Sequence, residues 1–252
     1  MIEIFILSIV QGITEFLPVS SSSHLILISK YFNFENQNLS LDVSLHIGSF
    51  FAVLFYFKYD IYNLLKNKDL FFKILISSVP VMIVGYILIQ LNFINYLRNI
   101  SIIGWTTLIF GLLLFIADKK SNTKYIKKDF DFKSAVFIGI FQIFSLIPGV
   151  SRSGITITAA RILNFKRVEA AKISFLLSIP TLAGVSIFGI NNLLTSENIE
   201  ITSINLVSIL LSFIFSFLTI KYFLKYIKKF SLLIFVLYRV VLGMVILFFA
   251  NL

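Results

Sequence analysis

Two pairs of short apolar runs, each pair interrupted by polar residues, constrain the fold of this chain more than any other sequence feature. The runs cover about 2–17 and 22–32 in the first pair and about 135–147 and 155–163 in the second. Pro18 and four serines separate the first pair, and Pro148 with neighbouring glycines separates the second. Such runs are too short to cross a hydrocarbon core of about 30 Å. Each pair therefore predicts a re-entrant hairpin of two half-helices that enters and leaves a membrane on one side.

Longer apolar runs follow each predicted hairpin, three after the first and three after the second. They lie at about 40–57, 70–90, 100–117, 170–190, 204–221 and 231–250. The chain is 58% hydrophobic and only 13% charged, about half the charged fraction of a soluble domain. These features predict an all-α polytopic membrane protein with six full spans and four half-helices. With no cysteine in the chain, disulfides and thiolate chemistry are excluded.

The order of the runs predicts one integral membrane domain, 1–252, that contains a repeat. The first copy covers about 1–117, a basic loop covers 118–134, and the second copy covers about 135–252. An odd number of spans per copy inverts the second copy, and interrupted helices in such repeats mark binding sites. Pro80 and Pro180 are expected to break spans at matching positions of the two copies.

The distribution of Lys and Arg gives the expected orientation. With these spans, 17 of the 22 Lys and Arg residues lie on one side, two on the other, and three within the membrane segments. Cytoplasmic loops carry an excess of positive charge, so the first side is expected to be cytoplasmic and both termini outside. The net charge of +10 then reflects contact with anionic membrane lipids. Nucleic acid is excluded as a partner because no basic soluble module is present.

Arg152 is the most informative ionisable residue, because a charge within a membrane is costly unless it has a function or a partner. It lies in PGVSRSG, at the predicted start of a half-helix, where free backbone N–H groups favour an anion. Ser151 and Ser153 add hydroxyl donors, and Gly149 permits close backbone approach. The guanidinium fork suits phosphate oxygens, so we expect a phosphate site. The alternative is an Arg that only pairs with Glu15 to hold the hairpins together.

Glu15 ends the first half-helix, with Gln11 four residues earlier on the same face. The carboxylate is a candidate ligand for a divalent cation or a candidate general base, with a simple ion pair to Arg152 or Arg239 as the alternative. Gln11 is an equally good candidate for a helix–helix hydrogen bond. Arg239, in the last span, is a candidate phosphate-binding residue or a neutralising partner of Glu15.

Ser20, Ser21, Ser22 and Ser23 form a hydroxyl-rich tip ahead of the second half-helix, followed by His24. A serine here is a candidate nucleophile or phosphate donor, and helix capping is the alternative. His24 is a candidate proton shuttle or nucleophile. Asp42 and His46 share a helical face at the start of the first full span, and we expect them near the outer surface as interface residues, with membership of the site as the alternative.

The residues from Gln11 to His24, QGITEFLPVSSSSH, resemble the (E/Q)xxxE and PVSS…H motifs of the undecaprenyl-diphosphate phosphatases, the bacitracin-resistance BacA/UppP family. Residues 148–154, PGVSRSG, resemble its PGxSRSG motif, and the similarity extends over nearly the whole chain. Two departures stand out: Gln11 replaces a common Glu, and Ser22-Ser23 replaces a common Thr-Gly.

The resemblance implies a multi-pass protein of the bacterial plasma membrane that hydrolyses undecaprenyl diphosphate and so serves peptidoglycan synthesis and bacitracin resistance. It implies Mg²⁺ or Ca²⁺ as a divalent cation, held by Glu15 with Gln11. It also implies Glu15 as the essential acid, Ser21 as nucleophile, His24 as acid or base, and Arg152 as phosphate ligand. A polyprenyl diphosphate lipid is then the substrate partner, and a homodimer is a further expectation. The alternative is a lipid flippase or transporter that uses the same anion site.

Overall fold

The structure, a computed structural model, describes residues 2–32, 34, 39–120, 123–195 and 203–250. This part of the chain is all-helical, apart from an isolated bridge between Lys124 and Phe165. The helices are α1 (Ile2–Thr14), α2 (Ser21–Phe32), α3 (Leu39–Tyr56), α4 (Lys58–Lys66), α5 (Lys68–Gln90), α6 (Ile94–Leu97), α7 (Ile100–Asp118), α8 (Ile126–Asp129), α9 (Phe132–Ile143), the 3-10 turn η1 (Phe144–Leu146), α10 (Arg152–Ile162), α11 (Arg167–Thr195), α12 (Ser203–Ile227) and α13 (Leu233–Ala250).

Each predicted hairpin is present as a pair of short helices around a break. The first pair is α1 and α2, and the second is α9, extended by η1, and α10. Local capping fixes where the second pair begins: the Asp131 carboxylate accepts from the backbone N–H of Ser134 at 2.8 Å ahead of α9. Ser151 caps α10 in the same way by accepting from the N–H of Gly154 at 3.1 Å. Both caps satisfy donors that a helix start leaves open.

Five of the six predicted spans are helices long and apolar enough to cross a membrane, namely α5, α7, α11, α12 and α13. The sixth predicted run, 40–57, forms α3, a shorter apolar helix. Pro80 and Pro180 lie inside α5 and α11, which continue through both prolines. The expectation that these prolines break the spans was wrong, because a helix in a membrane protein tolerates proline where neighbours satisfy the freed backbone groups.

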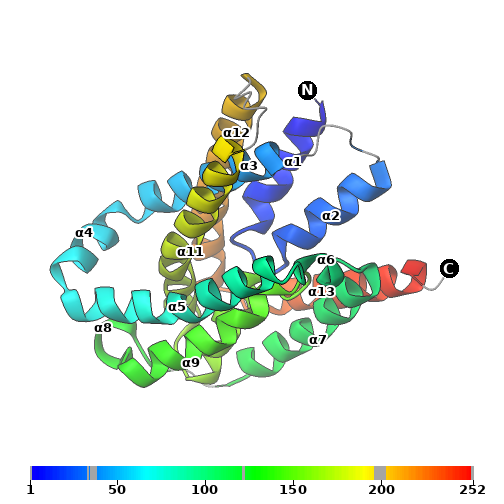
Figure 1. The fold of residues 1–252 in the computed structure, drawn as a ribbon. Helices are drawn as coiled ribbons and strands as arrows, with labels where there is room; N and C mark the ends of the chain where they lie inside the picture. The colour runs from blue at the N-terminus through cyan, green and yellow to red at the C-terminus, as the bar shows by residue number, and fades with distance from the viewer. Residues whose placement is uncertain (1, 33, 35–38, 121–122, 196–202, 251–252) are drawn as a thin grey trace.

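The helices pack through close backbone contacts at small residues. α12 packs against α3 and α1, α13 against α7, and α5 against α9. In Figure 1, α11 and α12 run roughly vertically, whereas α7, α9 and α13 run across the lower part of the molecule. A Cβ placed on Gly48 of α3 would lie 2.4 Å from the carbonyl oxygen of Ile209 in α12. Without a hydrophobic force between helices in lipid, such close approach supplies the packing energy.

We predict that Gly48→Ala destabilises the protein by about 1–3 kcal/mol, the usual cost of overpacking. The added methyl group would meet backbone atoms of α12, which cannot move aside as a flexible side chain can. The measurement is the thermal unfolding midpoint in detergent. Gly184→Ala is the matched control, because its Cβ would meet only the mobile Cε of Met82 at 3.3 Å. Equal midpoints for the two variants would contradict the prediction.

Candidate functional site

The breaks of the two hairpins lie against each other, although about 130 residues separate them in the sequence. The backbone N–H of Gly149 donates to the hydroxyl of Ser20 at 3.3 Å. The hydroxyl of Ser153 donates to the carbonyl oxygen of Leu17 at 2.6 Å. Each break thus satisfies polar groups of the other, which the apolar surroundings make obligatory.

The backbone at both breaks has an unusual conformation. Ser20 has a φ of 76° and Ser151 a φ of 71°, and each immediately precedes the first residue of a helix. Left-handed backbone costs a non-glycine residue about 1–2 kcal/mol. Gly149 has a φ of 96°, and a Cβ there would lie 2.0 Å from Oγ1 of Thr106. Glycine is therefore required at this position by both conformation and space.

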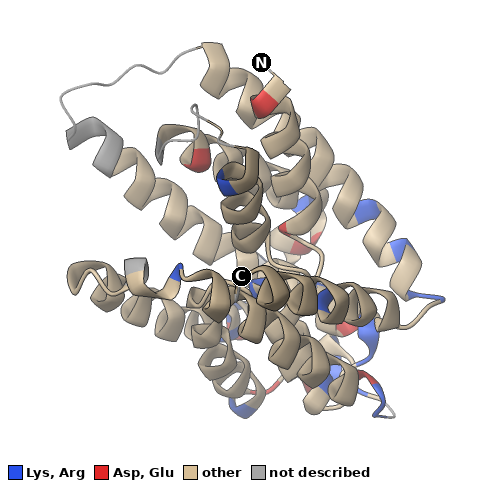
Figure 2. Ribbon diagram, turned by 90° about the vertical axis from the view of Figure 1, so that its right-hand side faces the viewer, with Lys and Arg blue, Asp and Glu red and all other residues tan. Residues whose placement is uncertain are grey.

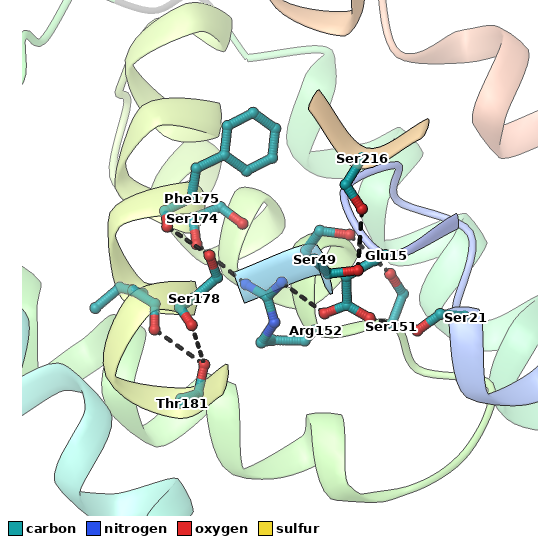
Figure 3. A network of polar contacts seen from close by, with 12 residues as sticks. Glu15, Ser21, Ser49, Ser151, Arg152, Ser174, Phe175, Ser178, Thr181 and Ser216 are labelled. Carbon is teal, nitrogen blue, oxygen red and sulfur yellow. Dashed lines mark hydrogen bonds and ion pairs between the residues drawn. The ribbon is translucent and has the colours of Figure 1, made fainter. Parts of the chain in front are cut away.

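Glu15 and Arg152 form an ion pair across the junction of the hairpins. Nη2 of Arg152 lies 2.9 Å from Oε1 of Glu15, and only 13% of the Arg152 side chain and 7% of the Glu15 side chain are exposed. Oε2 of Glu15 accepts a hydrogen bond from the hydroxyl of Ser21 at 2.7 Å. Figure 3 shows the guanidinium and the Ser21 hydroxyl approaching the same carboxylate. A potential nucleophile, a potential base and a cation therefore share one site.

Further polar groups orient this pair from the surrounding helices. Nε2 of Gln11 donates to Oε2 of Glu15 at 3.1 Å and lies 3.5 Å from the hydroxyl of Ser49. Nη1 of Arg152 donates to the carbonyl oxygen of Ser174 at 3.2 Å. Gln11 thus makes the helix–helix hydrogen bond that the sequence allowed as an alternative. These contacts fix the rotamers of the pair, as a preorganised site requires.

A cavity of about 200 Å³, here called the hairpin cavity, opens beside the ion pair. Six of the predicted site residues line it: Glu15, Ser20, Ser21, Ser22, Ser151 and Arg152. Apolar side chains line another part, among them Val81, Leu146, Leu182 and Val185. The hairpin cavity therefore combines hydroxyl groups and a cation with an apolar wall, as a site for an amphiphilic anion would. Gly149, Ser153, Gln11, His24 and Arg239 lie outside this lining.

Arg239 is fully buried and binds backbone rather than the Glu15 carboxylate. Its Nε donates to the carbonyl oxygen of Thr107 at 3.2 Å. Nη1 donates to the carbonyl of Pro18 at 3.3 Å, and Nη2 to that of Gly149 at 2.8 Å. One guanidinium thus joins both breaks to α7. No sequence motif indicates this role, because every residue has a backbone carbonyl that can accept such a bond.

The two histidines of the chain have different surroundings. Nδ1 of His24 lies 2.6 Å from the carbonyl oxygen of Ser20, and Nε2 lies 2.5 Å from the hydroxyl of Tyr238. The structure thus pairs both ring nitrogens of His24 with protein groups. His46 lines the hairpin cavity with Glu15 and Arg152, and its Nδ1 faces the carbonyl oxygen of Asp42 at 2.8 Å. For His46 the structure therefore agrees with the alternative, membership of the site, and not with the interface role, because α3 reaches the junction of the hairpins.

A row of buried serines, which was not predicted from the sequence, contacts Gln11 through Ser49. Ser49 lies 3.1 Å from Ser212 and 2.9 Å from Ser216, hydroxyl to hydroxyl. Ser208, Ser212 and Ser216 recur every four residues in an otherwise apolar helix. Polar residues at helical spacing within a predicted span are a readable signal of a helix contact.

The residues present fit a divalent cation only in part. Among the described residues, no group of three or more His, Asp or Glu side chains is placed to hold a metal ion. Oε1 of Gln11 is buried and has no hydrogen-bond partner in the described part of the chain, and Nε2 of the same amide donates to the Glu15 carboxylate. One carboxylate and one amide oxygen suit Mg²⁺ that takes its other ligands from phosphate and water. They do not suit a cation held by the protein alone.

The sequence of this chain matches a known protein family. The family model of the bacitracin resistance protein BacA matches residues 4–245. The chain belongs to the BacA family. Three of its relatives are named undecaprenyl-diphosphatase. The one from Pelagibacter ubique is 49% identical, with 97% of this chain and 96% of the relative aligned.

The two other relatives come from Saccharophagus degradans and Jannaschia sp. They are 45% and 38% identical, with 94% and 98% of this chain and 93% and 97% of the relatives aligned. The likeness to this BacA-family chain therefore includes both hairpins and the long helices.

We predict that Arg239→Lys lowers the stability of this BacA-family protein by about 3 kcal/mol or more, the cost of disrupting a buried charge and its partners. A single ammonium cannot reach three carbonyl oxygens that a planar guanidinium joins. The measurement is the thermal unfolding midpoint in detergent, with Arg98→Lys as the exposed control. A midpoint equal to that of the control would show that Arg239 does not join the breaks.

Proposed function

We propose that this protein is a membrane phosphatase that hydrolyses undecaprenyl diphosphate to undecaprenyl phosphate and inorganic phosphate. The observation that carries the proposal is the Ser21–Glu15–Arg152 arrangement in one cavity of the hairpin junction. The family assignment and the relatives named undecaprenyl-diphosphatase support the same reaction. The apolar wall of the hairpin cavity suits the start of a lipid tail, and its hydroxyl groups suit a phosphate.

The reaction follows from the hydrogen bond between Ser21 and Glu15. Glu15 takes the proton of the Ser21 hydroxyl. Oγ of Ser21 then bonds to the terminal phosphorus, while the bond between that phosphorus and the bridging oxygen of the diphosphate breaks. Undecaprenyl phosphate leaves with the proton that Glu15 took. Glu15 then takes a proton from water, whose oxygen bonds to phosphorus while the bond to Oγ of Ser21 breaks; Oγ regains that proton from Glu15, and inorganic phosphate is released. Arg152 neutralises charge on the transferred phosphoryl group, where most of the benefit in phosphoryl transfer lies. Ser20, Ser22 and Ser151 donate to the remaining phosphate oxygens.

We further propose that Glu15 and Gln11 would hold a divalent cation, Mg²⁺ or Ca²⁺, together with oxygens of the substrate. Such a cation, when bound, would offset the negative charge of the diphosphate. The buried, unpaired Oε1 of Gln11 supports this assignment. The roles of Gly149, Ser153 and Arg239 are indirect in this proposal, since each positions the breaks that carry the lining residues.

We also propose that the two hairpins belong to an inverted repeat. The matching left-handed serines, Ser20 and Ser151, each follow a Pro-containing turn and each immediately precede the first residue of a helix. The distribution of Lys and Arg supports a cytoplasmic side for the loops that follow α3 and α7 and an outer position for both termini. In this topology α3 spans the membrane in addition to the five longer helices, which gives six spans in all. The two hairpins then enter the membrane from opposite sides.

A lipid flippase remains the main alternative that uses the same anion site. The serine hydrogen-bonded to a carboxylate favours chemistry, because transport needs no nucleophile. The names of the relatives also describe a phosphatase. We therefore do not favour the flippase.

The proposed function predicts that purified protein in detergent releases phosphate from undecaprenyl diphosphate, and that Arg152→Lys retains about 1% or less of this activity. The loss of one preorganised charge-stabilising donor typically costs about 10²–10³ in rate. Phosphate release is measured at matched protein concentration after thermal unfolding confirms a folded variant. No release by the wild-type protein would contradict the phosphatase, and near-normal release by the variant would remove Arg152 from the reaction.

The different surroundings of the two histidines generate a second prediction for activity. We propose that His46, which lines the hairpin cavity with Glu15 and Arg152, transfers protons in the reaction, and we therefore expect His46→Gln to lower phosphate release about 10²-fold or more. His24→Gln should lower it less, since His24 does not line the hairpin cavity and both of its ring nitrogens bond protein groups, the Ser20 carbonyl oxygen and the Tyr238 hydroxyl. The two variants are compared by kcat and KM under the same conditions. A larger loss in kcat for His24→Gln would reverse the assignment.

A further inference from the structure

A second cavity, here called the basic cavity, lies apart from the hairpin cavity and shares no lining residue with it. Its volume is about 450 Å³. Five cationic side chains line it: Lys120, Arg161, Lys166, Arg167 and Lys228. They come from just beyond α7, from the last turn of α10, from the start of α11 and from just beyond α12. Figure 2 shows blue segments gathered in the lower right of the molecule.

The basic cavity lies where three apolar helices end. α7, α11 and α12 are each long and apolar enough to cross a membrane, and Lys120, Arg167 and Lys228 lie at or just beyond their ends. The ends of such helices meet the lipid headgroups. A hollow with positive charge at this level is therefore within reach of the membrane surface.

Carboxylates neutralise only part of the charge. Asp118 lies beneath the basic cavity, where it pairs with Nε of Arg161 at 3.0 Å and Nε of Arg167 at 2.8 Å. Glu169 lines the cavity, but its Oε2 accepts from the backbone N–H of Ile126 at 3.0 Å. Even with Lys120 left out of the count, four cations, Arg161, Lys166, Arg167 and Lys228, face these two carboxylates among the described residues. The local excess of positive charge favours an anion.

The guanidinium of Arg167 is held in place with its outer donors open. Asp118 fixes Nε, and neither Nη nitrogen bonds another residue in the described part of the chain. Arg161 is different, because its Nη groups donate to the carbonyl oxygens of Phe165, Asp118 and Lys120 and so form the floor. An anchored fork with free N–H groups is suited to phosphate oxygens.

We propose that the basic cavity binds a phosphate group, supplied by the headgroup of an anionic membrane lipid or by free phosphate. The position favours the lipid, because the basic cavity lies at the ends of helices long and apolar enough to cross a membrane, where lipid headgroups lie. Basic pockets between membrane helices on the cytoplasmic side take anionic headgroups for the same reason. Lys166 and Lys228 contribute charge at the rim, and Arg167 contributes the directed donors.

The test measures lipid binding to full-length protein in detergent by native mass spectrometry, with phosphatidylglycerol and phosphatidylcholine as probes. The double variant Lys166→Gln/Lys228→Gln removes two charges from the basic cavity. Lys127→Gln/Lys128→Gln removes two charges from α8, whose exposed lysines do not line it. We expect phosphatidylglycerol to bind the first variant about 30-fold more weakly, since each nearby cation contributes roughly a fivefold factor. The second variant should bind it within about twofold of the wild type, and phosphatidylcholine should not distinguish the proteins.

Phosphate release from undecaprenyl diphosphate should be unchanged in both double variants, which also shows that they fold. Competition by inorganic phosphate, lost in the first variant, would support the site with free phosphate as a ligand. Weakened lipid binding without such competition would support the site with the lipid as ligand. Equal weakening in the two double variants, or weakening in neither, would overturn the proposal.

Discussion

The ion pair between Glu15 and Arg152 is the interaction on which the rest of the site depends. Each charge would be costly alone in an apolar environment. At 2.9 Å the two charges offset each other. Glu15 also accepts hydrogen bonds from Ser21 and Gln11, and Arg152 also donates to the Ser174 carbonyl oxygen. The pair therefore both joins the two hairpins and places a guanidinium beside a hydroxyl. The same arrangement is therefore compatible with an ion pair that holds the hairpins together and with the proposed phosphate site.

Holding two helix breaks together requires a partner for every polar group that the breaks expose. The hydroxyls of Ser20 and Ser153 meet groups of the opposite break, and Arg239 binds the carbonyls of Pro18 and Gly149. The left-handed conformations of Ser20 and Ser151 cost free energy that these contacts offset. Strained serines directly before Ser21 and Arg152 also direct these two residues into the same hairpin cavity.

The helices around the junction act as a rigid support. Close contact at Gly48 brings the backbones of α3 and α12 together, and the serines of α12 then reach Ser49 and, through it, Gln11. Polar contacts inside the membrane region thus continue from the carboxylate to the far side of α3. The basic cavity lies outside this network, at the ends of α7, α11 and α12. Chemistry and the proposed lipid contact are therefore separate in space.

The sequence by itself determined the all-helical membrane character, the two interrupted hairpins and the residues that meet at their breaks. Apolar length and the cost of buried charge are local properties that the sequence carries directly, so Glu15, Arg152 and the serines were identifiable. Only the tertiary structure decided how the side chains pair. It placed Arg239 on backbone carbonyls, paired both nitrogens of His24 with protein groups, brought His46 into the hairpin cavity and carried α5 and α11 through their prolines. These outcomes depend on which helices pack together, because a contact with a carbonyl or a cavity of a distant segment has no local sequence pattern.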